Sequence, residues 1–300
     1  MSQEVWLAKL ADLNVYRARH GEAPHKPLLL LVLLELAERG ELNSNTLRLT
    51  PELSFRFNTL WPIVAYRRTQ QPDIRMPFHR LSRDGLWVPY TPDGALSPDQ
   101  KLTSYVRLND DFFRHTRDTE FRRRARRILI ARWFNPAERN ALYATFGMPV
   151  PSDDEVARDA RFELPEDAIR TGREARFRFE VVPAYNYTCA LTGYRISTID
   201  KGSIVDAAHI HEFSDSRNND PKNGMALCKN AHWMFDVGLW SVADDYRIVV
   251  AQDAFSEDSP DQKPLSEYHG SPLRLPKDAA LWPDPRHLAW HRKHKFLGAA

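Results

Sequence analysis

A run of eight consecutive apolar residues, Pro27 to Leu34, constrains the fold of this chain more than any other feature. The run stops at Glu35, and Pro27 suits the first turn of a helix that continues to about Glu38 before Arg39-Gly40 ends it. A helix that is apolar on most sides has to lie in a core. It is too short to cross a bilayer, which takes about 20 such residues. We therefore expect a globular domain built around this helix, and no membrane partner.

The N-terminal segment and the cysteine content favour the cytoplasm. The first residues include Glu4 and no basic segment followed by an apolar one, so no secretory signal is visible. Two cysteines in 300 residues argue against a disulfide scaffold and fit a reducing compartment.

The two halves of the chain differ in charge, although the whole carries a formal charge of only +2. Residues 1–150 contain 23 Lys and Arg against 16 Asp and Glu, and the remainder contains 19 against 24. A basic half favours a surface that binds a polyanion, but chance scatter of surface charge explains these numbers equally well. The arginine run in the helix expected over Asp118–Trp133 has two interpretations, a solvated face or a DNA contact.

A length of 300 residues predicts two domains. Residues 151–172 are acidic, contain Pro151 and Pro165 and show weak periodicity, which is typical of a linker. We expect a first domain of mixed helix and strand over residues 1–150 and a second domain, opening with a helix, over 173–300. The expected fold class is α+β.

The most informative segment lies in the second domain. Apolar, β-branched residues between Ile204 and Ile210 favour a strand with His209 near its end. A turn-rich stretch follows, and a short helix then carries His232 and Asp236 four residues apart on one face. This geometry suits a divalent cation.

These residue types also suit phosphodiester hydrolysis with one metal ion. A neutral His takes a proton from water, while a cation stabilises the scissile phosphate and the leaving oxygen. An Asn side-chain carbonyl that accepts from the other ring nitrogen fixes the tautomer. Each residue alone is more often structural, and only the ordered set favours this chemistry.

The same segment resembles the His-Asn-His motif of HNH nucleases, whose ββα-metal fold is two strands and a helix around one cation. The resemblance rests on Asp206-Ala-Ala-His209, on Asn223-Gly, and on His232 with Asp236. The spacing is 14 residues from His209 to Asn223 and nine from Asn223 to His232. The resemblance implies that His209 is the general base and that Asn223 orients it.

The resemblance also implies a metal site for Mg²⁺ or Mn²⁺. His232 matches a helix ligand, and Asp236 stands where many members have a second His. Ala208 occupies a position that often carries a ligand, so Asp206 is expected to replace it. The metal set is therefore Asp206, His232 and Asp236.

Many HNH domains carry two Cys-x-x-Cys knuckles around a structural zinc. This chain has only Cys189 and Cys228, one at each place. Two thiolates cannot complete a four-ligand site, so we expect no structural zinc and two small core residues instead.

Two segments of the first domain, 23–31 and 76–87, resemble the sulfur-binding domain that recognises phosphorothioate-modified DNA in McrA-like type IV restriction endonucleases. In that family, His and neighbouring cations hold the DNA backbone, and an apolar wall accepts the sulfur atom. Met76 stands where Tyr is usual and His79 where an aromatic residue is common, so the modification read can differ. The resemblance implies DNA contacts from His25, Lys26, Arg68, Met76, Pro77, Phe78, His79 and Arg80.

The sequence therefore predicts a modification-dependent endonuclease that acts on double-stranded, phosphorothioated DNA. One HNH site cuts one strand, so double-strand cleavage predicts two protomers, as in a homodimer, or two binding events. Two alternatives stay open. One is an HNH nuclease that reads modified cytosine or unmodified DNA, and the other is a DNA-binding protein whose HNH fold has lost activity.

Overall fold

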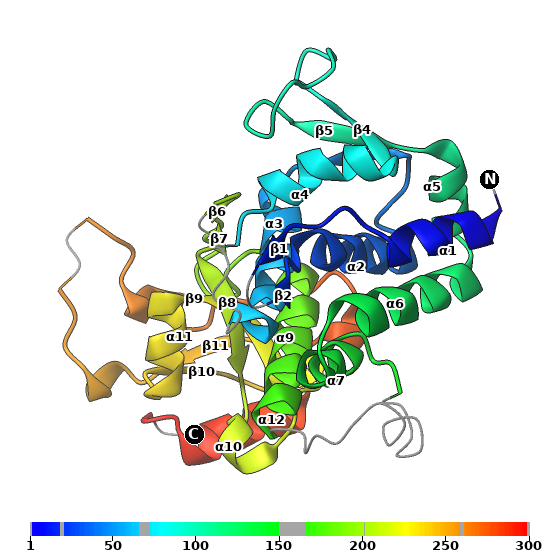
Figure 1. Ribbon diagram of the computed structural model, residues 1–300. Helices are drawn as coiled ribbons and strands as arrows, with labels where there is room; N and C mark the ends of the chain where they lie inside the picture. The colour runs from blue at the N-terminus through cyan, green and yellow to red at the C-terminus, as the bar shows by residue number, and fades with distance from the viewer. Residues whose placement is uncertain are drawn as a thin grey trace. The chain divides into compact units, whose positions relative to one another are not determined.

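The computed structural model describes residues 2–18, 21–65, 72–149, 166–200, 202–258 and 261–298. The chain divides into two compact units, residues 1–176 with 198–202 and residues 177–197 with 203–300 (Figure 1). Both units combine helices with small antiparallel sheets, which confirms the α+β class. No helix of the described part is long and apolar enough to cross a membrane.

The first unit combines helices with a three-stranded antiparallel sheet in the order β3-β5-β4. Its helices are α1 (Gln3–Ala11), α2 (His25–Glu38), α3 (Pro51–Leu60), α4 (Arg75–Arg80), α5 (Asp110–Thr116), α6 (Thr119–Trp133) and α7 (Pro136–Thr145). Its strands are β1 (Arg17–Ala18), β2 (Gly21–Glu22), β3 (Thr46–Arg48), β4 (Trp87–Tyr90) and β5 (Tyr105–Leu108). Short 3₁₀ turns are η1 (Trp61–Ile63) and η3 (Leu81–Asp84).

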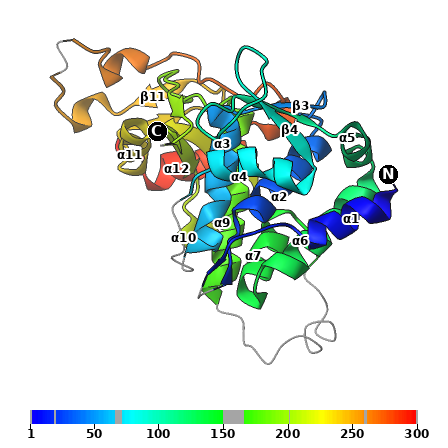
Figure 2. The same ribbon diagram turned by 45° about the horizontal axis from the view of Figure 1, so that its top comes forward.

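Helix α2 is the centre of this unit, as the apolar run predicts. Every residue from Leu28 to Leu34 is at most 1% exposed, and α2 packs against α3, α4 and α6 (Figure 2). The helix begins at His25, two residues before Pro27. Neighbouring helices cover α2 on several sides. A helix that is covered in this way has few positions that face water, so it can be apolar on most sides.

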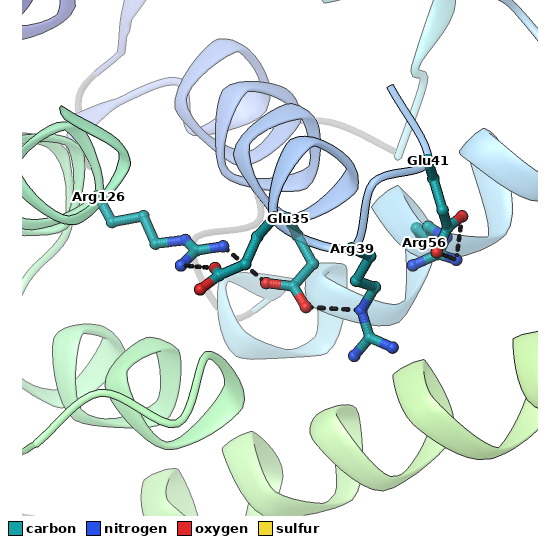
Figure 3. Close-up of polar contacts among 6 residues, drawn as sticks. Glu35, Arg39, Glu41, Arg56 and Arg126 are labelled. Carbon is teal, nitrogen blue, oxygen red and sulfur yellow. Dashed lines mark hydrogen bonds and ion pairs between the residues drawn. The ribbon is translucent and has the colours of Figure 1, made fainter. Parts of the chain in front are cut away.

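The arginines of α6 divide between buried and surface positions. Arg126 is 5% exposed and forms ion pairs with Glu35, at 2.8 Å, and with Glu38, both on α2 (Figure 3). Arg122 is also buried and donates to Thr116 O at 2.9 Å. Arg123 and Arg124 pair with Glu120 and Glu4, whereas Arg127 is exposed. Arg122 and Arg126 are therefore structural, and the two interpretations stay open for the arginines at the surface.

The second unit contains the segment that resembles an HNH motif. Its helices are α9 (Glu166–Ala184), which it enters at Phe177, α10 (Phe213–Ser216), α11 (Lys229–Asp236) and α12 (Pro285–His294). Its strands are β6 (Ser197–Thr198), β7 (Gly202–Ser203), β8 (Val205–His209), β9 (Gly224–Cys228), β10 (Trp240–Val242) and β11 (Ile248–Val250). The 3₁₀ turns are η4 (Pro221–Asn223), η5 (Gln252–Ala254), η6 (Leu265–Tyr268) and η7 (Ala279–Leu281).

The boundary between the units lies within α9, between Arg176 and Phe177. Residues 151–165 of the linker expected at 151–172 lie outside the described residues, as does Arg68. Residues 166–172 form the first part of α9, so the helix expected from Arg173 begins earlier. The sequence pattern missed this extension because the segment is acidic and has few apolar residues.

We predict that Arg126→Ala lowers the free energy of unfolding of the first unit by about 2–3 kcal/mol, because it removes the cation that neutralises two carboxylates near α2. Arg127→Ala, its exposed neighbour, is the control and should change stability by less than about 0.5 kcal/mol. Urea unfolding followed by far-UV circular dichroism measures both. Equal effects for the two variants would contradict the structural role of Arg126.

Candidate functional site

Two strands and a helix in the second unit assemble the predicted motif. Strands β8 and β9 pair antiparallel, with His209 opposite Gly224 and Val205 opposite Cys228. Helix α11 follows β9 directly and packs on both strands. The ββα arrangement and the position of His209 at the end of its strand are as the sequence predicts.

The glycine opposite His209 allows a helix to approach the strand pair closely. A Cβ atom at Gly224 would lie 2.7 Å from Phe177 Cζ and 2.6 Å from Val181 Cγ2, both on α9. The Phe177 ring stacks on the His209 imidazole, with centroids 3.9 Å apart and planes inclined by 6°. Gly224 thus leaves the space in which Phe177 fixes the plane of the imidazole.

An amide fixes the tautomer of the same imidazole. Asn219 Oδ1 lies 2.8 Å from His209 Nε2. A carbonyl oxygen can only accept, so Nε2 carries the proton and donates it. The lone pair of the neutral ring is then on Nδ1, which is the atom able to take a proton from water.

Asn223 acts on the chain that surrounds the site. Its side chain is fully buried, and its Oδ1 accepts from His211 N at 2.8 Å. Its Nδ2 donates to His211 O at 2.9 Å and to Asn218 O at 3.0 Å. The resemblance implied that Asn223 orients the base, and in the structure the residue at His209 Nε2 is Asn219. Asn223 instead holds the loop that carries Asn219.

His232 and Asp236 lie together on α11, with Nε2 and Oδ2 3.4 Å apart. Burial raises the pKa of Asp236, and the nearby charges of His232, Lys295 and His209 oppose this shift. Glu212, which also acts on Asp236, pairs with Lys295 at 2.5 Å. The protonated form of His209 therefore interacts favourably with the Asp236 carboxylate.

The predicted set of three metal ligands is not assembled. Asp206 Oδ1 lies 2.9 Å from Arg178 Nε and accepts from Ala207 N at the same distance. Across the described ranges, no three His, Cys, Asp or Glu side chains are grouped so that they could hold an ion. In the structure Asp206 pairs with an arginine of α9, which the strand sequence cannot reveal, and its role as a metal ligand stays a prediction.

The remaining pair still fits a divalent cation. One imidazole nitrogen and one carboxylate leave several coordination positions open. Mg²⁺ commonly keeps water in such positions and accepts phosphate oxygens there. His232 and Asp236 are the side chains that would hold the ion.

Both cysteines are buried, as expected for core residues. Cys228 Sγ lies 3.9 Å from Thr192 Oγ1. A hydrogen bond between the two cysteine side chains lowers the pKa of Cys189 to about 5. The absence of a structural zinc stays a prediction.

The first unit divides the predicted DNA contacts into buried and accessible residues. His25 is 1% exposed and packs 4.7 Å from the ring of Trp61. Lys26 Nζ donates to Asp84 Oδ2 at 2.6 Å and to Asn14 O at 2.7 Å. Lys26 is thus committed to a buried ion pair, and neither residue presents its side chain at the surface.

The segment 76–80 lies on α4. Phe78 is fully buried and its carbonyl accepts from Trp87 Nε1 at 2.8 Å, and Pro77 is also buried. Met76 and His79 are half-buried, and Arg80 is exposed. His79 Nδ1 lies 2.8 Å from Thr103 Oγ1, and burial lowers the pKa of His79. The accessible part of the predicted set is Met76, His79 and Arg80.

Sequence reasoning missed two residues that contact His209. Asn219 lies in a stretch whose composition is typical of a turn. A second amide between His209 and Asn223 was the one feature of the sequence that could have indicated it. Phe177 lies 32 residues before His209 and gives no local signal.

A buried histidine fastens α12 to the helix that carries the His232–Asp236 pair. His291 is 2% exposed and stacks on Phe235 with centroids 3.6 Å apart. Its Nε2 lies 3.0 Å from Phe235 O and must donate, so Nδ1 accepts from Ser241 Oγ at 2.8 Å. Burial lowers the pKa of His291 to about 4, which keeps the ring neutral at pH 7.

Family models match both units. Residues 3–150 match the ScoMcrA-like DNA sulfur-binding domain, and residues 189–243 match the HNH endonuclease family. No curated protein matches the chain significantly.

Three solved structures are similar to parts of this chain. The modification-dependent TagI restriction endonuclease is 24% identical, with a TM-score of 0.33, and the match covers 48% of this chain and 44% of that one. The sulfur-binding domain of SprMcrA complexed with phosphorothioated DNA is 19% identical, with a TM-score of 0.38, over 46% of this chain and 91% of that one. The corresponding ScoMcrA domain complexed with phosphorothioated DNA is 25% identical, with a TM-score of 0.31, over 43% and 86%. Since these scores are low, the domain assignment rests on the family models.

We predict that Asn223→Ala lowers the free energy of unfolding of the second unit by about 3 kcal/mol, because it removes three hydrogen bonds and strands backbone groups. Asn230→Ala, at an exposed position of α11, is the control and should be near neutral. Differential scanning calorimetry measures both. A loss below about 1 kcal/mol for Asn223→Ala would show that the loop does not depend on this amide.

We predict that the second unit loses about 2 kcal/mol of stability between pH 7.5 and pH 5 through His291. The folded ring has a pKa of about 4 against 6.5 for a free ring, so the unfolded chain binds the proton first as the pH falls. The contribution is therefore complete above pH 6.5 and is lost progressively below it. Urea unfolding at several pH values measures the slope, and His291→Gln should flatten it. An unchanged slope in the variant would assign the pH dependence to other groups.

Proposed function

We propose, for a chain in which residues 3–150 belong to the ScoMcrA-like DNA sulfur-binding domains and residues 189–243 to the HNH endonucleases, that the whole protein is a modification-dependent DNA endonuclease. The first unit binds duplex DNA that carries a phosphorothioate linkage. The second unit hydrolyses a phosphodiester bond with His209 as general base and one divalent ion.

The observation that carries this proposal is the environment of His209. Its ring plane is held by Phe177 and its tautomer by Asn219, at the end of strand β8 in the ββα unit. Here the Phe177 ring holds the plane of the imidazole, and Asn219 Oδ1 accepts from Nε2, which places the lone pair of the neutral ring on Nδ1.

The chemistry follows from these positions. His209 Nδ1 accepts a proton from a water molecule, and the resulting hydroxide attacks the phosphorus atom while the bond to the leaving oxygen breaks. The proton passes to the imidazole, and the positive charge that develops there is stabilised by the Asp236 carboxylate nearby. His232 and Asp236 would hold a divalent ion, which when bound would supply positive charge to the phosphate and to the leaving oxygen.

DNA recognition is proposed at the accessible part of α4. Arg80 offers a guanidinium to a phosphate, and His79 lies beside it with a partly buried ring. Met76 offers a soft, polarisable thioether to the sulfur atom, which is larger and more weakly hydrated than oxygen. Four residues of the predicted set are buried and do not reach the DNA directly: His25, Lys26, Pro77 and Phe78. Arg68 stays a predicted contact.

The alternative hypothesis is a DNA-binding protein without nuclease activity. It is supported by Ala208, which stands where a metal ligand is common, and by Asp206, which pairs with Arg178 and not with the residues on α11. The environment of His209 favours the enzyme. Because one site cuts one strand, we propose that double-strand cleavage uses two protomers.

We predict that the full chain with Mg²⁺ or Mn²⁺ cleaves a phosphorothioated duplex in preference to matched duplexes that are unmodified or cytosine-modified. His209→Ala should slow cleavage by about 10²–10⁴-fold, because it removes the general base. Gel analysis of end-labelled strands measures both rates. His269→Ala removes an exposed histidine of the same unit and should cleave like the wild type.

Each component of the proposal can fail separately. Equal, weak nicking by the wild type and by His209→Ala would exclude the enzyme. Cleavage without preference for any modification would leave a nuclease that does not depend on modification. Preference for the cytosine-modified duplex would replace the hypothesis that the protein recognises phosphorothioated DNA.

A further inference from the structure

Helix α12 lies outside both family matches, which end at residues 150 and 243. One side of the helix is buried, with Leu288 fully covered and His291 bound to Phe235 O and Ser241 Oγ. The opposite side carries rings and cations at helical spacing: Arg286, His287, Trp290, Lys293 and His294. The buried face attaches the helix to the core of the second unit, and the other face lies at the surface, where Lys293 and His294 are exposed.

The rings on this side are stacked. His211 stacks on Trp290 with centroids 3.9 Å apart and planes inclined by 21°, and Trp290 stacks on His294 at 5.1 Å and 17°. His287 lies 5.8 Å from His211 and its Nε2 is 3.2 Å from Asn218 Nδ2. Stacking occupies ring faces, so the nitrogen-bearing edges are the parts that can bind an acceptor outside the protein. We call His211, Trp290, Lys293 and His294 the α12 platform.

The platform is joined to the proposed nuclease site by the backbone. His211 is two residues beyond His209, and the Asn223 amide holds both the N–H and the carbonyl of His211. The same loop therefore fixes the general base and the first ring of the stack.

The charge of the helix indicates the kind of polymer. Of its cations, Arg286 pairs with Asp284, Arg292 with Asp244 and Lys295 with Glu212. Lys293 is exposed and forms no hydrogen bond or ion pair with any residue that the structure describes. No acidic residue occurs between Pro285 and His294. An uncompensated cation beside N–H-bearing ring edges suits a phosphodiester backbone.

We propose that the α12 platform binds the DNA backbone next to the scissile phosphate. This rests on the proposed function for the location of the cut, but the binding itself does not require cleavage. The platform would anchor the strand that His209 attacks, and would do so without reading sequence or modification.

The test measures DNA binding by the full-length protein in EDTA, so that no strand is cut. Lys293→Glu and Trp290→Ala are compared with the wild type by fluorescence anisotropy on an unmodified and a phosphorothioated duplex. Lys277→Glu, at an exposed position of the same unit, is the charge-matched control. We expect both platform variants to bind each duplex about five- to tenfold more weakly, with the salt dependence of Lys293→Glu reduced by about one phosphate contact. The preference for the modified duplex should not change, and the control should bind like the wild type.

Unchanged affinity for Lys293→Glu would overturn the proposal, and so would an equal loss for Lys277→Glu. The binding result for Trp290→Ala counts only if the thermal transition of this variant matches that of the wild type. If it does not, Lys293→Glu decides the question, because it changes a surface side chain. Normal binding by both variants together with inactive His209→Ala would sink the platform and leave the proposed function intact. Weakened binding in a protein that cleaves no duplex would support the platform while the nuclease proposal fails.

Discussion

The fully buried amide of Asn223 is the interaction on which the rest of the candidate site depends. Its three hydrogen bonds close the connection between β8 and β9 by holding the backbone at His211 and Asn218. Asn219, which fixes the tautomer of His209, follows Asn218 directly. One side chain thus sets the position of the base, of its orienting partner and of the ring that stacks on α12, because unpaired backbone groups in this buried loop would be costly.

The site is held from its periphery by contacts that carry no net charge. Phe177 reaches His209 only because Gly224 has no side chain, and His291 is neutral where it joins Phe235 and Ser241. Charged groups collect at the open end of the same unit, around His232 and Asp236. This separation is physically sensible, since neutral contacts position an imidazole without shifting its charge, and the charges remain where water and a phosphate can meet them.

The sequence could predict those parts of the fold and site that depend on local spacing. The strand ending at His209, the helix with His232 and Asp236, and the buried helix α2 all follow from periodicity and turn residues within a short window. The partners of Asp206 and Lys26 could not be predicted, because Arg178 and Asp84 are far away in the chain and nothing in a single sequence pairs them. The resemblance implied that Asn223 orients His209, whereas the hydrogen bonds of Asn223 go to His211 and Asn218, because the motif specifies an amide and leaves its hydrogen-bonding partner open.

The charge asymmetry of the chain shows why counting cations does not locate a DNA surface. A buried cation loses its hydration and has to be paired, so each one recruits an acid and contributes nothing to the outer potential. In the basic half, Lys26 and Arg126 are used in this way, whereas Arg80 is exposed. In the acidic half, Lys293 is exposed beside a stack of rings. Burial and pairing therefore decide which cations a polyanion can reach, and such cations occur in both halves of the chain.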